Sequence, residues 1–416
     1  MGDRPQIEFR APHPGEATEF FRPVLEGFGL EVTPETIAHE RVLWEPERSF
    51  GALDGDGWVG SSGAYSLEAT LPGRATVPVS GITMVGVAPT HRRRGILREM
   101  MRRLLDDAVG RGESMAILTA SETNIYERFG FGVAARFETQ EIDTSAAAFR
   151  QPLAERGRFR SIPPGEALGL VDSVWNRCRV ERVGELSRRR ARWEDYLADP
   201  KGGREGMSAL RVVIHEGADG SDGIVTYRSV GSWGPETHRL PSARVDVDVL
   251  IGATPEVEAA LWQFVTQVDL IKTVRFVTRP IDDPIRWRLA DPRQLTVISV
   301  GDWYWVRPLD VAAMLGARSY RTSGELVVEL LDGERPDVGG RFRLTAGTDG
   351  AACVRAPEAT ADLTLGPTEL GALSFGGVAP SVLAAAGRID EHTGGALTRA
   401  DLLFPIDPAP FSSTMF

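Results

Sequence analysis

The 416-residue sequence predicts an α+β protein built from three successive domains. The length is two to three times that of a typical domain of roughly 100–200 residues. Helix-like and strand-like segments alternate in three blocks, which we place at residues 1–147, 148–300 and 301–416. The composition, 42% hydrophobic and 25% charged, allows an ample core without disulfide staples.

The composition also excludes several classes of protein. The two cysteines, Cys178 and Cys353, are far apart and lack metal-ligand spacing, so we expect a reducing cytoplasm and no metal. No stretch approaches the roughly 18–20 apolar residues of a membrane span, and residues 1–16 lack the apolar centre of a signal peptide. A net charge of -11 disfavours general nucleic-acid binding.

In the first block we predict helices at 21–30 and 33–42, then two strands around a glycine-rich turn between 49 and 73. A further strand ends at Pro89. Apolar residues from Ile96 to Ala108 follow the spacing of a helix. A short buried strand at 114–121 and a helical turn from 123 complete the block.

The second block repeats this order: helices near 171–178 and 187–197, then strands around one long helix at 254–269. We interpret it as a diverged copy of the first block. The third block alternates strands with helices at 367–375 and 381–389, and it ends in an extended, proline-interrupted tail.

Positive charge is concentrated between Met84 and Leu105, where six arginines and one histidine meet a single glutamate. This stretch could be a solvated helix face, a nucleic-acid patch or a pocket for one small polyanion. A strand, a basic glycine-containing loop and a helix start together form an anion site, because the first helical N–H groups lack partners. We expect Gly95 to allow close approach of a phosphate, and Arg98, Arg102 and Arg103 to have side chains on the wet helix face.

The segment RRRGIL, residues 92–97, resembles the R-x-x-G-x-G/A pyrophosphate loop of the GNAT acetyltransferase superfamily. Leu97 departs from the Gly or Ala of the sixth position. The segments VGVAPTHRRRGIL and LTASETNIYERFGF, with the three-block length, are similar to the enhanced intracellular survival (Eis) protein family. That resemblance implies two tandem GNAT-like domains, with mixed sheets and flanking helices, followed by a sterol-carrier-protein-like α/β domain.

The same resemblance implies an acetyl-CoA-dependent N-acetyltransferase and suggests which residues bind the donor. Backbone groups of Val85, Gly86 and Val87 would meet the pantetheine arm and the acetyl carbonyl. Ser121 and Glu122 would flank the thioester arm, with Asn124 as a further contact; from spacing alone, Ser121 could equally cap the next helix. The pyrophosphate would be held by the loop and helix start, namely Arg93, Arg94, Gly95, Ile96, Leu97 and Arg98.

Two residues are predicted to move protons, and both roles come from the resemblance. Tyr126 would be the general acid, since a phenol with a pKa of about 10 can donate to a leaving thiolate; the alternative is core packing. The C-terminal carboxylate of Phe416 would be the base. With a usual pKa of about 3.5, it would need desolvation or a relaying water, and the alternative is a frayed tail.

No second cofactor site is visible in the second block. Residues 188–195 lie within a helical run without a loop glycine, and the glycine-rich residues 201–206 precede a strand. Family members acetylate aminoglycosides and lysines, which implies an acidic acceptor cleft. Glu26 is a candidate cation contact there, although an exposed helix glutamate is the simpler interpretation.

The main alternative function is a lipid or sterol carrier with a non-catalytic GNAT scaffold. The apolar run at 370–387 could line a cavity or close a core, so it does not decide between them. Nucleic-acid binding is disfavoured by the acidic balance and by the lack of aromatic residues among the arginines. By resemblance we also expect a homo-oligomer, namely a hexamer.

Overall fold

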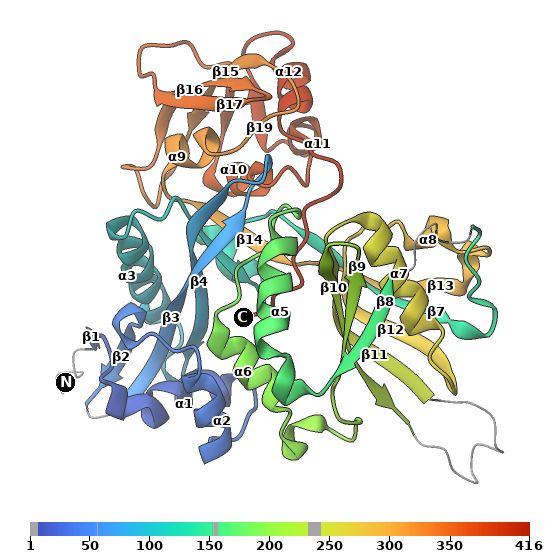
Figure 1. Cartoon of the computed structure of the whole chain (residues 1–416). Coiled ribbons are helices and arrows are strands. Elements are labelled where there is room, and N and C mark those ends of the chain that lie inside the picture. Colours follow the sequence, from blue (N-terminus) through green and yellow to red (C-terminus); the bar gives the residue numbers. More distant parts are fainter. Residues whose placement is uncertain (1–6, 56, 152, 154–156, 232–242) are drawn as a thin grey trace. The chain divides into compact units, whose positions relative to one another are not determined.

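The computed structural model describes residues 7–416 except 56, 152, 154–156 and 232–242 (Figure 1). Residues 1–6, part of the segment in which the sequence predicts no signal peptide, therefore lie outside the described residues. The chain forms two compact units. The first consists of Met1–Ala134, Trp303–Ile406 and Phe416, and the second of Ala135–Asp302 and Asp407–Met415. These units divide the chain at other positions than the expected boundaries at 147 and 300.

The first unit contains a seven-stranded sheet with the order β1-β2-β3-β4-β5-β14-β6. Its strands are β1 (Glu8–Arg10), β2 (Gly51–Asp54), β3 (Gly57–Thr70), β4 (Thr76–Val87), β5 (Met115–Thr119), β6 (Gly132–Val133) and β14 (Tyr304–Pro308). β4 and β5 run parallel but pair only at Ser80 with Ala116 and Gly81 with Ile117. Beyond Gly81 the two strands separate.

The helices that accompany this sheet lie near the predicted ones, although the first begins at Ala17 and ends at Gly27 rather than spanning 21–30. They are α1 (Ala17–Gly27), α2 (Pro34–Arg41), α3 (Ile96–Gly110) and α4 (Thr123–Tyr126). Thr33 caps α2 by accepting a hydrogen bond from the backbone of Thr36, and Pro34 follows at the first helical position. α3 buries the apolar stripe that its spacing predicts, from Ile96 to Ala108. Burial of each large apolar side chain contributes about 1.5–3 kcal/mol, which fixes α3 against the sheet.

Strand pairing does not follow the three sequence blocks. β14 follows the second block in the chain, yet it lies between β5 and β6 of the first sheet. All five of its residues are buried, as in a central strand covered on both faces. In turn β7 (Arg136–Asp143), which we had placed in the first block, pairs with β12 and β13 of the second sheet. Short apolar segments do not specify their partner strands, so these pairings were not visible in the sequence.

The second unit contains the sheet β13-β7-β12-β11-β10-β9-β8. Its other strands are β8 (Arg158–Ile162), β9 (Arg211–Gly217), β10 (Gly220–Val230), β11 (Ala243–Gly252), β12 (Ile271–Arg279) and β13 (Leu295–Asp302). Its helices are α5 (Pro164–Arg179), α6 (Arg190–Ala198), α7 (Pro255–Thr266) and α8 (Ile285–Arg288). One core cluster contains Trp262 of α7, and a second contains Trp175 of α5 and Trp193 of α6.

A five-stranded sheet, β17-β16-β15-β18-β19, belongs to the first unit. Its strands are β15 (Gly324–Leu330), β16 (Gly340–Gly347), β17 (Gly350–Arg355), β18 (Leu363–Leu365) and β19 (Ile389–Glu391). The helices are α9 (Val311–Gly316), α10 (Pro367–Leu373), α11 (Pro380–Ala385) and α12 (Ala396–Leu403). In the apolar run at 370–387, Leu370, Leu373 and Phe375 are buried. No helix among the described residues is both long and apolar enough to span a membrane.

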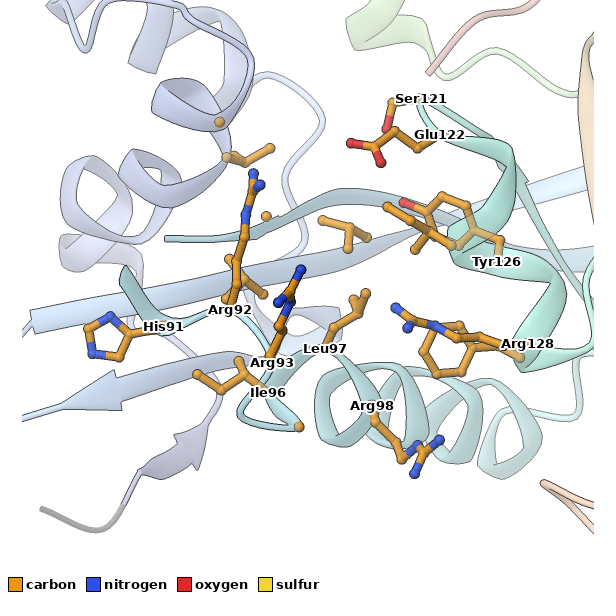
Figure 2. Close-up of a pocket in the computed structure, with 18 of the residues that line it drawn as sticks. His91, Arg92, Arg93, Ile96, Leu97, Arg98, Ser121, Glu122, Tyr126 and Arg128 are labelled. Carbon is orange, nitrogen blue, oxygen red and sulfur yellow. The ribbon is translucent and has the colours of Figure 1, made fainter. Parts of the chain in front are cut away.

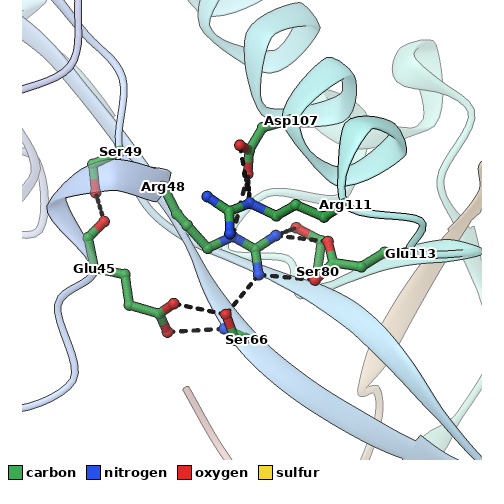
Figure 3. A network of polar contacts seen from close by, with 8 residues as sticks. All are labelled: Glu45, Arg48, Ser49, Ser66, Ser80, Asp107, Arg111 and Glu113. Atoms are coloured by element: carbon green, nitrogen blue, oxygen red, sulfur yellow. Dashed lines mark hydrogen bonds and ion pairs between the residues drawn. The ribbon is translucent and has the colours of Figure 1, made fainter.

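A buried ion-pair network connects η2 (Pro46–Arg48) to α3 and to the residues before β5 (Figure 3). The Arg48 side chain is fully buried and donates to both carboxylate oxygens of Glu113, at 2.8 and 2.6 Å. It also donates to Asp107 at 3.2 Å and to the hydroxyls of Ser66 and Ser80. Burial raises the pKa of Glu113, although the Arg48 guanidinium opposes that shift. The network fixes the sheet at the point where β4 and β5 are paired.

Candidate active site

A pocket of about 820 Å³ opens in the first unit beside the start of α3 (Figure 2). Its walls come from α1, the end of β4, the loop and first turn of α3, and the segment around α4. The lining residues are Val24, Gly27, Phe28, Val85, Gly86, Val87, His91, Arg92, Arg93, Gly95, Ile96, Leu97, Arg98, Ser121, Glu122, Ile125, Tyr126, Arg128 and Phe129. The structure thus brings together on one pocket most of the residues that the sequence singled out.

The loop before α3 has the backbone shape of an anion site. Gly95 precedes the first helical residue with φ of +79°, and Arg93 has φ of +63°. The first N–H groups of a helix have no partners within the helix, and the helix dipole makes this end positive. A Cβ on Gly95 would meet no atom within 4 Å, so its left-handed conformation, rather than a tight protein contact, requires the glycine.

The arginines of this region divide into two groups. Figure 2 shows the guanidinium groups of Arg93 and Arg128 pointing into the same space from the α3 loop and from the segment after α4. Arg94, which we expected at the pyrophosphate, does not line the pocket; its side chain donates to Asp54 at 3.2 Å. Asp54 also contacts His91 at 2.9 Å, and its carboxylate holds the Arg94 side chain away from the pocket.

The expected wet face of α3 is confirmed for Arg98 and Arg102, whose side chains are exposed, whereas Arg103 is half-buried with its guanidinium carbon 5.5 Å from the centre of the Phe9 ring. Arg102 bonds to Glu99 and Asp106, and Arg103 bonds to Glu99. Arg98 lines the pocket, and its side chain is exposed, with a nitrogen 3.8 Å from a carboxylate oxygen of Glu334.

The end of β4 forms the second wall. Met84 adopts φ of +55°, and the register of β3 against β4 shifts between Ser61 and Gly63, which marks a bulge. Because β4 has already separated from β5, Val85 to Val87 face the pocket. Gly86 is required by space: a Cβ there would lie 2.6 Å from the Cα of Val24 in α1.

Tyr126 lies at the other end of the same pocket, almost fully buried. Its ring packs edge-on against Phe131, with centroids 6.1 Å apart. Burial, and then the negative charge of Glu122, raise the pKa of Tyr126 to about 12. The phenol is therefore protonated at neutral pH and can serve as a proton donor.

Three further expectations concern neighbouring residues. Ser121 lines the pocket and does not cap α4, because the N-cap position is Glu122. Asn124 and Glu26 do not line the pocket. The Glu26 carboxylate lies 3.5 Å from Arg22 on the exposed side of α1, as expected of a solvated helix residue.

Phe416 is packed rather than frayed, although it is not among the lining residues. Its ring lies 6.3 Å from that of Tyr65 on β3 and 5.9 Å from that of Tyr304 on β14, measured between centroids. A Cβ on Gly81 would come within 3.0 Å of this ring. Gly81 is the last β4 residue paired with β5, so the ring lies where the two strands separate.

Arg128 was not predicted as a site residue. It lies two residues after Tyr126 and lines the pocket, with its guanidinium carbon 5.0 Å from the centre of the Phe129 ring. Its position next to the expected acid was the available signal, but sequence gives no direction for an exposed side chain.

Known protein families account for most of the chain. Residues 8–134 and 184–308 each match an acetyltransferase (GNAT) domain, and residues 311–413 match a sterol carrier protein domain. The N-acetyltransferase Eis of Mycobacterium tuberculosis is 32% identical over 387 residues, covering 90% of this chain and 91% of the relative. This chain belongs to the Eis-type N-acetyltransferases.

Other Eis-type and GNAT proteins agree with this placement. An uncharacterized N-acetyltransferase of Streptomyces coelicolor is 39% identical over 403 residues, covering 95% of this chain and 96% of the relative. The crystal structure of Eis1 from Mycobacterium abscessus has a TM-score of 0.86 and 29% identity, covering 99% of this chain and 100% of that one. The predicted α+β fold, with tandem GNAT domains and a sterol-carrier-like domain, is confirmed.

Acetyl-CoA is the donor that GNAT domains imply, and the residues of this Eis-type pocket fit it. A pyrophosphate is anionic, and the pocket offers a helix N-terminus with open space at Gly95 and the side chains of Arg93 and Arg128. The long pantetheine arm needs an extended backbone partner, which the separated end of β4 supplies.

Proposed function

We propose that this N-acetyltransferase transfers acetyl from acetyl-CoA to primary amines of polyamino acceptors, either aminoglycoside-like molecules or lysine side chains. Tyr126 acts as the general acid and the Phe416 carboxylate as the base. The observation that carries this proposal is the presence of a protonated, buried phenol in the same pocket as the helix-end anion site.

The proton transfers follow from the chemistry of the reaction. The acceptor nitrogen bonds to the acetyl carbon, and the bond between that carbon and sulfur breaks. Tyr126 donates its proton to the departing sulfur, which otherwise leaves as a thiolate. The base takes the proton that the amine loses. Holding the amine and the thioester together supplies much of the rate, because the encounter no longer costs entropy during the reaction.

Two residues on the pocket wall, one charged and one apolar, support a polyamino acceptor. Glu122 is an acidic residue on the pocket wall, which favours cationic amines. Phe28 also lines this pocket and is 60% exposed, so it offers an apolar surface to the body of an acceptor.

The proposal also includes a cytoplasmic location and a homohexameric assembly. Sedimentation velocity would measure the assembly. Leu370, Leu373 and Phe375 are buried, which by itself favours neither a packed core nor a lipid cavity, so we do not propose a carrier function.

The test is thiol release from acetyl-CoA with a panel of aminoglycosides and lysine peptides. We expect release that depends on the acceptor and falls about 10²–10⁴-fold in Tyr126→Phe. Calorimetric binding of acetyl-CoA to the variant checks that the pocket is intact. Absence of acetyl-CoA binding to the wild-type protein would overturn the proposal, as would full activity of Tyr126→Phe.

A further inference from the structure

The short segment after Tyr126 carries a further pocket residue, Arg128, and continues into β6. It begins with η4 (Glu127–Phe129), and Gly130 follows with φ of +81°. The N–H of Phe131 donates to the Tyr126 carbonyl at 3.3 Å, and the Phe131 ring packs edge-on against the Tyr126 ring. The direction of the Tyr126 phenol in the pocket therefore depends on how this segment is held.

Helix α10 of the sterol-carrier-like domain packs against this segment, and both belong to the first unit. The contact is between backbones, because glycines face it from both sides. A Cβ on Gly132 would lie 1.8 Å from the carbonyl oxygen of Thr368, and a Cβ on Gly371 would lie 2.1 Å from a carbonyl oxygen of β14. A Cβ on Gly130 would lie 2.8 Å from the Pro367 ring. The helix thus fixes the far end of the segment directly through the backbone.

An ion pair connects the start of the segment to the same domain. Arg388, directly before β19, donates through Nη2 to the carboxylate of Glu127 and through Nε, at 2.6 Å, to that of Glu369 on α10. The other Glu369 oxygen accepts from the backbone N–H of Gly366 at 3.1 Å, and the Glu369 side chain is only 9% exposed. The Thr368 hydroxyl donates to the Glu127 carbonyl at 3.4 Å. Arg388 is therefore anchored at a buried carboxylate while it reaches Glu127 near the surface.

The pair of Arg388 and Glu127 is better suited to fixing a direction than to stabilising the fold. Both side chains are half-exposed, and exposed ion pairs add little to global stability. A displacement of about 1 Å at a reacting group, in contrast, can cost about 10²-fold in rate. Glu127 lies between Tyr126 and Arg128 in the chain, so a shift of its backbone moves both pocket residues.

We propose that Arg388 is a positioning residue for catalysis, because it holds Glu127 and with it the two pocket residues on either side. This inference rests on the proposed function, and it gives the sterol-carrier-like domain a role in acetyl transfer. Arg388 does not line the pocket, and it acts through Glu127.

The experiment compares Arg388→Gln, Glu127→Gln and the double variant in the full-length chain. Arg399→Gln is the matched control, because Arg399 lies in the same domain, is also 40% exposed and pairs with Asp362 at 3.0 Å. Three quantities are measured. They are kcat and KM for acetyl-CoA in thiol release, the pKa of Tyr126 from tyrosinate absorbance with Tyr126→Phe as reference, and the midpoint of urea denaturation.

We expect kcat to fall about tenfold in both single variants and no further in the double variant, because either change breaks the same pair. The pKa of Tyr126 should fall from about 12 toward its usual value of about 10, since a looser segment lets water reach the phenol. The KM for acetyl-CoA should rise less than kcat falls, because Arg93 and the start of α3 still bind the donor. The urea midpoint should stay near that of the wild type.

A Tyr126 pKa that keeps its wild-type value in both single variants would overturn the inference, whatever happens to kcat. A shifted pKa with an unchanged kcat would overturn it as well, and so would equal losses in Arg399→Gln. Full activity of Tyr126→Phe would instead contradict the proposed acid, while the Tyr126 pKa in Arg388→Gln would still report whether Arg388 holds the segment.

Discussion

Gly86 on β4 lies directly against the backbone of α1 at Val24. A Cβ on Gly86 would be 2.6 Å from the Cα of Val24 and 3.0 Å from the carbonyl oxygen of Pro23. Gly86 and Val24 both line the pocket, so their contact sets its width between the strand and the helix.

Gly86→Ala should therefore widen the gap between β4 and α1 and weaken donor binding. Backbone atoms cannot yield as a side-chain end can, so we expect a loss of about 1–3 kcal/mol in the free energy of unfolding. Acetyl-CoA affinity, measured by calorimetry, should fall at least tenfold. Gly110→Ala is the control, because Gly110 does not line the pocket and a Cβ there meets nothing within 4 Å. Wild-type affinity in Gly86→Ala would contradict the close packing.

Burial and the charge of Glu122 raise the pKa of Tyr126 to about 12, which predicts how kcat and stability depend on pH. The folded-state pKa exceeds the usual value of about 10, so the phenol keeps its proton throughout the neutral range. Ionisation of Tyr126 should not lower kcat until the pH approaches about 12, whereas this group's contribution to stability is fully present below pH ~10 and is lost between there and about 12. Tyrosinate absorbance, with Tyr126→Phe as reference, measures the pKa. Glu122→Gln should lower it, and an ionisation near neutral pH would rule the prediction out.

Arg128 should contribute to donor binding through its charge. Charge-assisted hydrogen bonds contribute about 1.5–3 kcal/mol, so Arg128→Ala should weaken acetyl-CoA binding at least tenfold. The affinity should also become less sensitive to salt. The matched control is Arg102→Ala on the exposed face of α3, where Arg102 is paired with Glu99 and Asp106. Equal losses in both variants would show that only the overall charge matters.

Local features of the fold and site could be predicted from the sequence. The spacing of apolar residues from Ile96 to Ala108 predicts α3, and the glycine before the helix start predicts the shape of the loop at Gly95. These follow from dihedral preferences and periodicity, which act over a few residues. The resemblance to GNAT proteins supplied Tyr126, which the structure places in the pocket.

Features that depend on distant partners could not be predicted. Arg94, in the loop before α3, turns away from the pocket because of Asp54 on β2, and no spacing rule links the two residues. The position of β14 between β5 and β6 depends on pairing with strands that precede the whole second sheet in the sequence. The segment YWVRP of β14 contains no local signal that predicts which strands pair with it.

The buried pair of Arg48 and Glu113 gives a stability prediction for the first unit. Arg48→Met leaves the Glu113 carboxylate buried without its partner, so we expect a loss of about 3–5 kcal/mol in the free energy of unfolding. The double variant Arg48→Met/Glu113→Leu should recover much of that loss, because both charges are then gone. Urea denaturation measures both. The control is Arg111→Ala, whose ion pair with Asp107 is partly exposed and should change stability by less than about 1 kcal/mol.

A chain that ends at Asp302 should fail to form the acetyl-CoA pocket, although it contains every lining residue. Without β14, the backbone of β5 from Met115 to Thr119 loses the partner that pairs along its whole length. β5 leads directly to Ser121 and Tyr126, so its exposed edge should both loosen the pocket and promote aggregation. A chain ending at Asp310 keeps β14 and is the matched comparison. Size-exclusion chromatography and calorimetric acetyl-CoA binding measure the difference. If the shorter chain stayed monodisperse and bound acetyl-CoA as the longer one does, β14 would not be part of what holds the pocket.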